Sequence, residues 1–218
     1  MIQLENLTKY YATPKGRRYV FRDVNYTFPE QGNIGVLGYN GAGKSTLMRL
    51  IGGTDFANAG RVRKDCRISW PIGLGSGFQG SLTGRENVKF VSRVYGDSAA
   101  LRRQRIEYVA DFAEIGTYFD MPVNTYSSGM RSRLSFGLSM AFEFDVYLVD
   151  EVIAVGDKRF KEKSQEAFRQ KQEKARLITV SHDLSLLKSL CNVGIVLNKG
   201  EFQSFESIDD AITAYQQL

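Results

Sequence analysis

Apolar and polar residues alternate along the start of the chain, which is the pattern of strands that bury one face. The segments MIQLENLTKYY and YVFRDVNYTF both follow this pattern, and a turn that contains Pro14 and Gly16 separates them. Farther along, DFANAGRVRKDCRISW returns to the same strand-like composition. The pattern therefore predicts an antiparallel β part built from residues 1–32 and about 59–72.

Short apolar runs alternate with amphipathic segments in two other regions of the chain. Residues 34–37 and 145–149 are apolar runs typical of buried parallel strands, and segments with helical periodicity follow them. The runs RLITVSH and VGIVLN, with helical segments beside them, repeat this order up to SIDDAITAYQQL. Strands that alternate with helices indicate a mostly parallel sheet with helices on its faces. The predicted fold class is therefore α/β, with its core in residues 33–58 and 141–218.

A helical insert is predicted between the two halves of this core, at about residues 83–140. Its helical patterning covers residues 84–95, about 98–115 and 128–141. Either Ser81 or Thr83 is suited to cap the first helix, which carries Glu86 in its first turn. The stretch before it, residues 71–82, is rich in Gly and Ser, and so long a loop in a compact domain usually has a function.

The segment NIGVLGYNGAGKSTLMRLIGG carries the most specific motif of the chain. It contains G-x-x-x-x-G-K-[ST] between an apolar strand and an amphipathic helix, a context that disfavours a chance glycine-rich turn. Such a turn points successive backbone N–H groups into one hollow at a helix N-terminus, which suits a polyphosphate. Lys44 would then reach the β- and γ-phosphates, and the Ser45 hydroxyl would take a position on Mg²⁺. The predicted nucleotide-binding residues of this P-loop are Gly38, Asn40, Gly41, Ala42, Gly43, Lys44, Ser45 and Thr46.

Acidic and histidine side chains follow two of the other predicted strands. Asp150 and Glu151 end the run DVYLVDE, and His182, the only histidine, ends RLITVSH. An exposed strand end would explain an Asp-Glu pair alone, and a lone histidine is more often structural. Ligands of open α/β sheets, however, bind at the carboxyl ends of the strands, where the P-loop also leaves its strand. We therefore predict Asp150 as a Mg²⁺ ligand through its water shell, Glu151 as the catalytic residue that polarises the attacking water, and His182 as a catalytic hydrogen-bonding partner of the γ-phosphate or that water.

Two further features have both a structural and a functional interpretation. YSSGM opens a predicted helix, so the Ser127 hydroxyl and the Gly129 N–H offer a second anion site, although the same residues are ordinary cap chemistry. Tyr10 and Tyr11 precede the P-loop, and an aromatic ring there could stack on a nucleobase. From the pattern alone, a pair of sheet aromatics is the simpler interpretation of these tyrosines.

The composition and charge of the chain limit where the protein is located and which partners it has. The chain has 218 residues, 43% of them hydrophobic, which is enough for a substantial core. No apolar run approaches the roughly 20 residues that cross a bilayer, and no signal-peptide pattern is present, so we expect a protein that is cytosolic or peripheral to a membrane. Cys66 and Cys191 form no spacing motif and are expected to be reduced thiols. The net charge of +5 is too diffuse to favour a nucleic-acid partner.

The order of these motifs resembles the ATPase domain of ABC transporters along the whole chain. This resemblance implies a RecA-like P-loop NTPase fold, ATP and Mg²⁺ as cofactors, and ATP hydrolysis as the activity. YSSGMRSRL is similar to the family signature L-S-G-G-Q-x-Q-R, with Ser127 and Gly129 on the matching Ser and second Gly. The resemblance also implies that Asp157 is the nucleotide-site Asp of the D-loop and that Tyr11 is the aromatic residue that stacks on adenine.

The chain departs from the family pattern at several positions. In the signature, Tyr126 replaces Leu, Ser128 replaces the first Gly and Met130 replaces Gln. Val152 follows the Asp-Glu pair where Pro is usual. The loop that usually carries a Gln has none in register, since Gln79 lies a few residues late. A contact from a loop Gln to the metal or water is therefore not assigned.

The segments ISWPIGL, GFQGSLTGREN, YSSGMRSRL and DEVIAVGD together resemble ATP-binding subunits that export bacterial cell-surface polysaccharides, most of all the capsular exporters of the KpsT type. This resemblance implies a head-to-tail homodimer, in which Ser127 and Gly129 of one chain face the P-loop of the other. It also implies two copies of an integral membrane permease subunit, further envelope export proteins, and a lipid-linked polysaccharide that this subunit need not touch. The expected location is the cytoplasmic face of the bacterial inner membrane, peripheral through the permease.

Other functions stay open at this stage. The same kind of subunit serves exporters of other surface glycopolymers, such as O-antigen or teichoic acid. A soluble ABC ATPase acting on nucleic acid or ribosomes usually carries two cassettes or a long coiled-coil insert. A P-loop kinase would need an acceptor pocket and lid arginines, and it would not need a signature helix.

Overall fold

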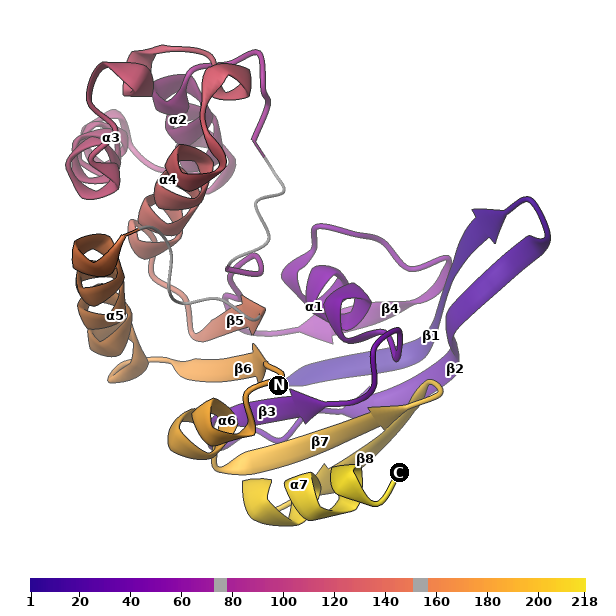
Figure 1. The fold of residues 1–218 in the computed structure, drawn as a ribbon. Helices are drawn as coiled ribbons and strands as arrows, with labels where there is room; N and C mark the ends of the chain where they lie inside the picture. The colour runs from indigo at the N-terminus through magenta and orange to yellow at the C-terminus, as the bar shows by residue number, and fades with distance from the viewer. Residues whose placement is uncertain (73–77, 151–156) are drawn as a thin grey trace. The chain divides into compact units, whose positions relative to one another are not determined.

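The computed structural model describes residues 1–72, 78–150 and 157–218, and the chain divides into two compact units (Figure 1). Unit 1 comprises Met1–Pro71, Phe144–Glu151 and Lys174–Leu218, and unit 2 comprises Ile72–Glu143 and Val152–Glu173. Unit 1 holds both sheets, and unit 2 holds most of the helices along the middle of the chain.

The larger sheet of unit 1 has the order β5-β6-β3-β7-β8 in the described part of the chain. Its strands are β3 (Ile34–Leu37), β5 (Val146–Asp150), β6 (Arg176–Val180), β7 (Val193–Asn198) and β8 (Glu201–Phe205). The first four run parallel, and β8 is antiparallel to β7. Every residue of β3 and β5 is buried, as expected for strands that are covered on both faces. The predicted mostly parallel α/β sheet is confirmed.

The smaller sheet of unit 1 is antiparallel and has the order β2-β1-β4. Its strands are β1 (Ile2–Thr13), β2 (Gly16–Thr27) and β4 (Ala59–Lys64). Thr13 pairs with Gly16, so the β1–β2 hairpin closes in a shorter turn than the sequence predicts. Strand pairing extends the hairpin because Tyr11 and Ala12 find partners across the turn in β2.

Two apolar clusters cover the faces of the parallel sheet. On one face, α1 (Lys44–Gly52) and the antiparallel sheet pack together, in a cluster that includes Leu4, Phe21, Val36, Leu47 and Leu148. On the other face lie α6 (Leu184–Leu190) and α7 (Ile208–Gln216), in a cluster that includes Leu37, Leu187, Val196, Ala211 and Ile212. The sheet is therefore the middle layer of unit 1, and the P-loop leaves it between these layers.

Unit 2 is helical in its described part. It contains α2 (Gly84–Val94), α3 (Ala99–Ala113), α4 (Ser128–Met140) and α5 (Lys158–Gln172), with short 3-10 helices η1 (Gly116–Asp120) and η2 (Val123–Thr125). Thr83 caps α2 in a capping box with Glu86, which decides between the two predicted caps. Phe112 of α3 stacks on Phe136 of α4 and meets Phe160 of α5 edge-on, with centroids 5.9 and 5.6 Å away. These rings join the three helices into one core.

Two observations bear on the expectations from composition. None of the helices in the described ranges is long and apolar enough to cross a membrane. Cys66 and Cys191 are both free thiols. Burial raises the pKa of Cys191 to about 11, so this thiol stays protonated and unreactive at neutral pH.

Candidate nucleotide-binding site

Three parallel strands end at the same edge of the sheet in unit 1. Val36 of β3 lies opposite Val180 of β6, and Val180 in turn lies opposite Asp150 of β5. The P-loop begins directly after β3, and His182 lies two residues past the end of β6. The register of the sheet therefore brings the P-loop, Asp150 and His182 to one edge. This is the edge at which ligands of open α/β sheets bind.

Two glycines set the path of the P-loop because no side chain fits at their positions. A Cβ on Gly38 would lie 2.4 Å from the carbonyl oxygen of Leu197 in β7. Gly43 has a φ of +106°, and its Cβ would lie 2.6 Å from Val20 Cγ1 in β2. Strand β7 of the larger sheet and strand β2 of the smaller sheet thus lie against the two ends of the loop, and only glycine allows so close an approach.

The N-terminus of α1 is suited to bind an anion. The described residues supply no side-chain cap, and the first turn of this helix contains no acidic residue, so its positive end faces no carboxylate of its own. The Lys44 side chain is buried, and its Nζ donates hydrogen bonds to the carbonyl oxygens of Gly38 at 2.5 Å and Tyr39 at 3.1 Å. These bonds hold the ammonium group at the loop, where phosphate oxygens would offer it stronger charge-assisted partners.

The oxygen donors at this edge fit a small divalent cation. Asp150 is only 8% exposed at the end of β5, and Ser45 is half-buried in the first turn of α1. The described residues contain no cluster of three or more His, Cys, Asp or Glu suited to a metal ion. In proteins Mg²⁺ is commonly held by one or two carboxylates and completes its shell with phosphate oxygens and water.

Of the two predicted catalytic residues, His182 lies within the described residues and Glu151 does not. His182 is exposed in the turn between β6 and α6. Beside it, Ser181 is buried, and its hydroxyl accepts the Asp183 N–H at 3.0 Å, which orders this turn. Glu151 lies outside the described residues, as does Val152, so the role of Glu151 stays a prediction.

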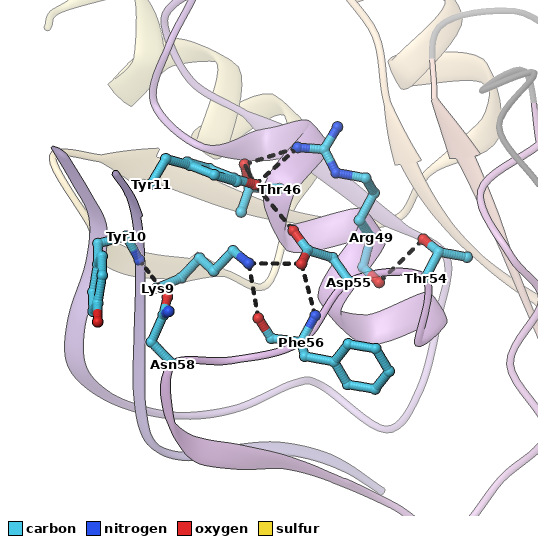
Figure 2. A network of polar contacts seen from close by, with 9 residues as sticks. All are labelled: Lys9, Tyr10, Tyr11, Thr46, Arg49, Thr54, Asp55, Phe56 and Asn58. Atoms are coloured by element: carbon cyan, nitrogen blue, oxygen red, sulfur yellow. Dashed lines mark hydrogen bonds and ion pairs between the residues drawn. The ribbon is translucent and has the colours of Figure 1, made fainter. Parts of the chain in front are cut away.

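Tyr11 is tied to α1 and to the loop after it through its hydroxyl group (Figure 2). This hydroxyl donates to Asp55 Oδ2 at 3.0 Å, accepts a hydrogen bond from Arg49 Nη2 at 3.1 Å, and lies 3.4 Å from Thr46 Oγ1. The side chain of Tyr11 is 38% exposed, so the ring keeps free surface beside the P-loop helix.

The neighbouring Tyr10 has different surroundings. Its ring packs against Tyr19 with centroids 5.3 Å apart, and the Arg17 guanidinium lies 4.6 Å from its centre. Successive residues of a strand point to opposite faces, which separates the two tyrosines. Tyr10 is thus an aromatic residue of the hairpin, and Tyr11 is the one that meets the P-loop helix.

The signature segment forms an exposed helix N-terminus in unit 2. Ser127 caps α4, since its Oγ accepts the Met130 N–H at 3.2 Å. Ser127, Ser128 and Gly129 are all exposed, so the hydroxyl and the first N–H groups of this helix are accessible to an anion from outside. The departures from the family signature leave this helix start intact.

Tyr126, where the family has Leu, has a clear structural role. Its side chain is 3% exposed, and its hydroxyl donates to the Tyr118 carbonyl at 2.6 Å and accepts the Gly84 N–H at 3.2 Å. Burial raises the pKa of Tyr126, which keeps the hydroxyl protonated as a donor. This tyrosine therefore fixes the start of α4 to η1 and to the first turn of α2.

Asp157 caps α5 and joins it to α4. Its Oδ1 accepts the Phe160 N–H at 3.0 Å, and its other oxygen forms an ion pair with Arg133 of the signature helix. The hydrogen bond from the Phe160 N–H and the charge of Arg133 hold the pKa of Asp157 below its usual value. Asp157 is thus placed by contacts inside unit 2, and its predicted contact with nucleotide stays a prediction.

Several residues around the P-loop were missed by the sequence analysis. Lys9, Arg49 and Asp55 belong to no motif, and only the folded chain brings them together (Figure 2). Arg18 is the cross-strand partner of Tyr11, and its Nη2 lies 3.8 Å from where a Cβ on Gly41 would be. The hairpin register could have pointed to Arg18, because Tyr11 was already a candidate.

Comparisons with known proteins show the family of the chain. Residues 21–154 match the family model described as ABC transporter. The chain is 55% identical over 218 residues to the polysialic acid transport ATP-binding protein KpsT of Escherichia coli, covering 100% of this chain and 99% of that protein. It is 43% identical to the capsule polysaccharide export ATP-binding protein CtrD of Neisseria meningitidis serogroup B, with both chains covered completely.

Solved structures show the same fold. A dimeric ATP-binding cassette bound to ADP and Pi superposes with a TM-score of 0.71 at 22% identity, covering 94% of this chain and 98% of that one. An ATP-binding subunit of an ABC transporter gives a TM-score of 0.74 at 18% identity, with 99% of both chains covered. The predicted P-loop NTPase fold is confirmed. The chain belongs to the ABC transporter family, as an ATP-hydrolysing, nucleotide-binding member of the group that includes the polysialic acid transport protein KpsT and the capsule polysaccharide export protein CtrD.

Proposed function

We propose that this chain is the ATPase subunit of an exporter that moves a lipid-linked capsular polysaccharide across the bacterial inner membrane. The observation that carries the ATPase part is the shared sheet edge of the P-loop, Asp150 and His182. The substrate class rests on relatives of capsule and polysialic acid export that match the chain from end to end. The teichoic acid export relative of Lactococcus lactis is 34% identical, but the chain covers only 43% of it, so that cargo is the second candidate.

In this proposal several residues of unit 1 each contact one part of ATP or its metal ion. The P-loop N–H groups and Lys44 bind the phosphates, and the Tyr11 ring stacks on adenine. Ser45 and Asp150 hold Mg²⁺, which when bound neutralises phosphate charge. Glu151 polarises the attacking water, and His182 hydrogen-bonds the γ-phosphate or that water.

A second copy of the chain completes the site. The P-loop of one copy and the exposed start of α4 at Ser127 and Gly129 of the other would hold ATP between them. Asp157 of the D-loop would adjoin the same nucleotide. ATP acts as the link because its phosphates bind donors on both chains at once, and hydrolysis removes that link. The dimer in which a structurally similar cassette was solved supports this arrangement.

The dimer would transmit its opening and closing to two copies of a membrane permease, and the chain would be held at the cytoplasmic face of the membrane by that contact. The test is copurification of this chain with its permease, followed by ATPase assay with and without candidate glycolipids. The proposal predicts that the chain follows the membrane fraction only when the permease is present, and that a lipid-linked capsular polymer stimulates hydrolysis. Membrane association without the permease, or stimulation by a teichoic acid precursor alone, would contradict it.

A further inference from the structure

A buried lysine lies beside the tyrosine that is proposed to stack on adenine (Figure 2). The Lys9 side chain is 8% exposed, and its Nζ donates to Asp55 Oδ1 at 2.6 Å and to the Phe56 carbonyl at 2.8 Å. A buried ammonium group is stable only when its donors find such partners. The pair therefore fastens the segment after α1 to strand β1, next to Tyr11.

The two carboxylate oxygens of Asp55 accept hydrogen bonds from different donors. Oδ1 accepts from Lys9 and from the Phe56 N–H at 2.7 Å, while Oδ2 accepts from the Tyr11 hydroxyl at 3.0 Å. Burial opposes ionisation of this carboxyl group, but the hydrogen bonds from Lys9, Phe56 and Tyr11 outweigh burial and lower its pKa. At neutral pH the carboxylate is thus a permanent acceptor for the tyrosine.

The same hydroxyl group also reaches the P-loop helix. It accepts from Arg49 Nη2, which is itself 3.3 Å from Thr46 Oγ1, so the tyrosine is joined to the first turn of α1 as well as to the segment after it. Lys9 Nζ lies 4.9 Å from the centre of the Tyr11 ring, so a cation is positioned over one face of the ring. A base that stacks on Tyr11 would therefore use the face of the ring opposite Lys9.

We propose that Asp55 is a positioning residue for adenine recognition, which holds the Tyr11 ring in the orientation that receives the base. This inference rests on the proposed function. Lys9 compensates the Asp55 charge and fixes the carboxylate, and Asp55 in turn fixes the hydroxyl end of the tyrosine. With that end held, the ring is already ordered before ATP binds, so less entropy is lost when the base stacks.

The test compares two ligands that differ in the base. Dissociation constants of the full chain are measured for MgATP and for magnesium tripolyphosphate, which has the phosphates and lacks adenine. Base–aromatic stacking is worth roughly 5- to 140-fold in affinity. Asp55→Ala should therefore weaken MgATP binding by about 5- to 10-fold, since the ring remains but loses its order. Tripolyphosphate binding should change by less than about 2-fold.

Glu5 provides a matched control. The Glu5 side chain is 24% exposed, nearly the same as the 23% of Asp55. Glu5 also forms an ion pair, with Arg61 at 2.6 Å, between strands β1 and β4. Glu5→Gln should leave both dissociation constants unchanged. Tyr11→Phe keeps the ring and removes only the hydroxyl, so it should reproduce the loss seen in Asp55→Ala. The double variant should be no worse than either single variant, because both remove the same link.

The outcomes separate this inference from the proposed function. If Asp55→Ala weakens both ligands equally, Asp55 has only a structural role and the inference is wrong. Full MgATP affinity in Tyr11→Phe would likewise overturn it, and this variant answers the question even when Asp55→Ala fails to fold. If the wild-type chain binds neither ligand, the proposed function itself fails.

Discussion

The contact between Gly43 and strand β2 gives a prediction whose size can be worked out from the structure. Gly43→Ala adds one methyl group at a backbone φ of +106°. That methyl would lie 2.6 Å from Val20 Cγ1 and 3.0 Å from Phe21 Cζ. Phe21 is 1% exposed in the core of unit 1, so it has little room to move.

Two free-energy costs add up for Gly43→Ala. A left-handed backbone costs a non-glycine residue about 1–2 kcal/mol. Overpacking against a filled core costs about 1–3 kcal/mol more. Gly41→Ala is the matched control, because Gly41 also has a positive φ, +84°, but the nearest atom to its Cβ would be Arg18 Nη2 at 3.8 Å. Only the backbone term applies there, so the two variants should differ by about 1–3 kcal/mol in unfolding free energy.

Thermal unfolding of both variants without nucleotide measures this difference. For a domain of this size each kcal/mol shifts Tm by about 2–4 °C, so Gly43→Ala should melt about 6 °C below Gly41→Ala. Nucleotide is left out because both glycines line the proposed phosphate site and ligand binding would change Tm by itself. Equal melting temperatures would refute the view that packing against β2 sets the path of the P-loop.

Three further predictions concern catalysis, the dimer and acid stability. Glu151→Gln should bind ATP and form a lasting dimer by size-exclusion chromatography while hydrolysis falls at least about 100-fold, and near-normal hydrolysis would reject Glu151 as the base. Ser127→Arg should abolish turnover and leave ATP binding to the monomer unchanged in equilibrium dialysis, whereas normal turnover would exclude the cross-dimer site. Asp97 is 6% exposed and accepts Arg105 Nε at 2.6 Å, so Asp97→Asn should cost about 3 kcal/mol of unfolding free energy at pH 7. Burial opposes ionisation of Asp97, but the hydrogen bonds from Arg105 and Ser92 lower its pKa, so this stabilisation is complete above the unfolded pKa of about 4 and is lost as pH falls through the folded value. Urea unfolding of both proteins at pH 7 and pH 3 should therefore show the gap narrowing in acid, and a gap that stays constant would contradict this assignment.

Much of this fold follows from patterns between residues close together in the sequence. The apolar run 193–198 predicts β7 with the bounds that the structure has, and Thr83, which caps α2, is one of the two caps that the sequence offers. The P-loop motif predicts a strand, a tight turn and a helix, and β3 and α1 flank it. These features are local, since a strand's periodicity, a helix cap and a glycine-rich turn each depend on a few neighbouring residues.

The relation between distant segments could not be predicted in this way. Tyr10 and Tyr11 look alike in the sequence, and only the hairpin and the helix packed beside it decide which tyrosine meets the P-loop. The Lys9–Asp55 pair joins residues 46 positions apart. Tyr126 is a departure from a motif until its hydroxyl is seen to join η1 and α2 to the start of α4.

Neighbouring residues are enough to predict the P-loop, the α/β core and the signature helix, because each depends on local order. The side chains that hold the Tyr11 ring, and the contacts that require glycine at position 43, become visible only in the folded chain. Close packing and hydrogen bonds between segments depend on register and side-chain volume across the fold, and no local pattern records them.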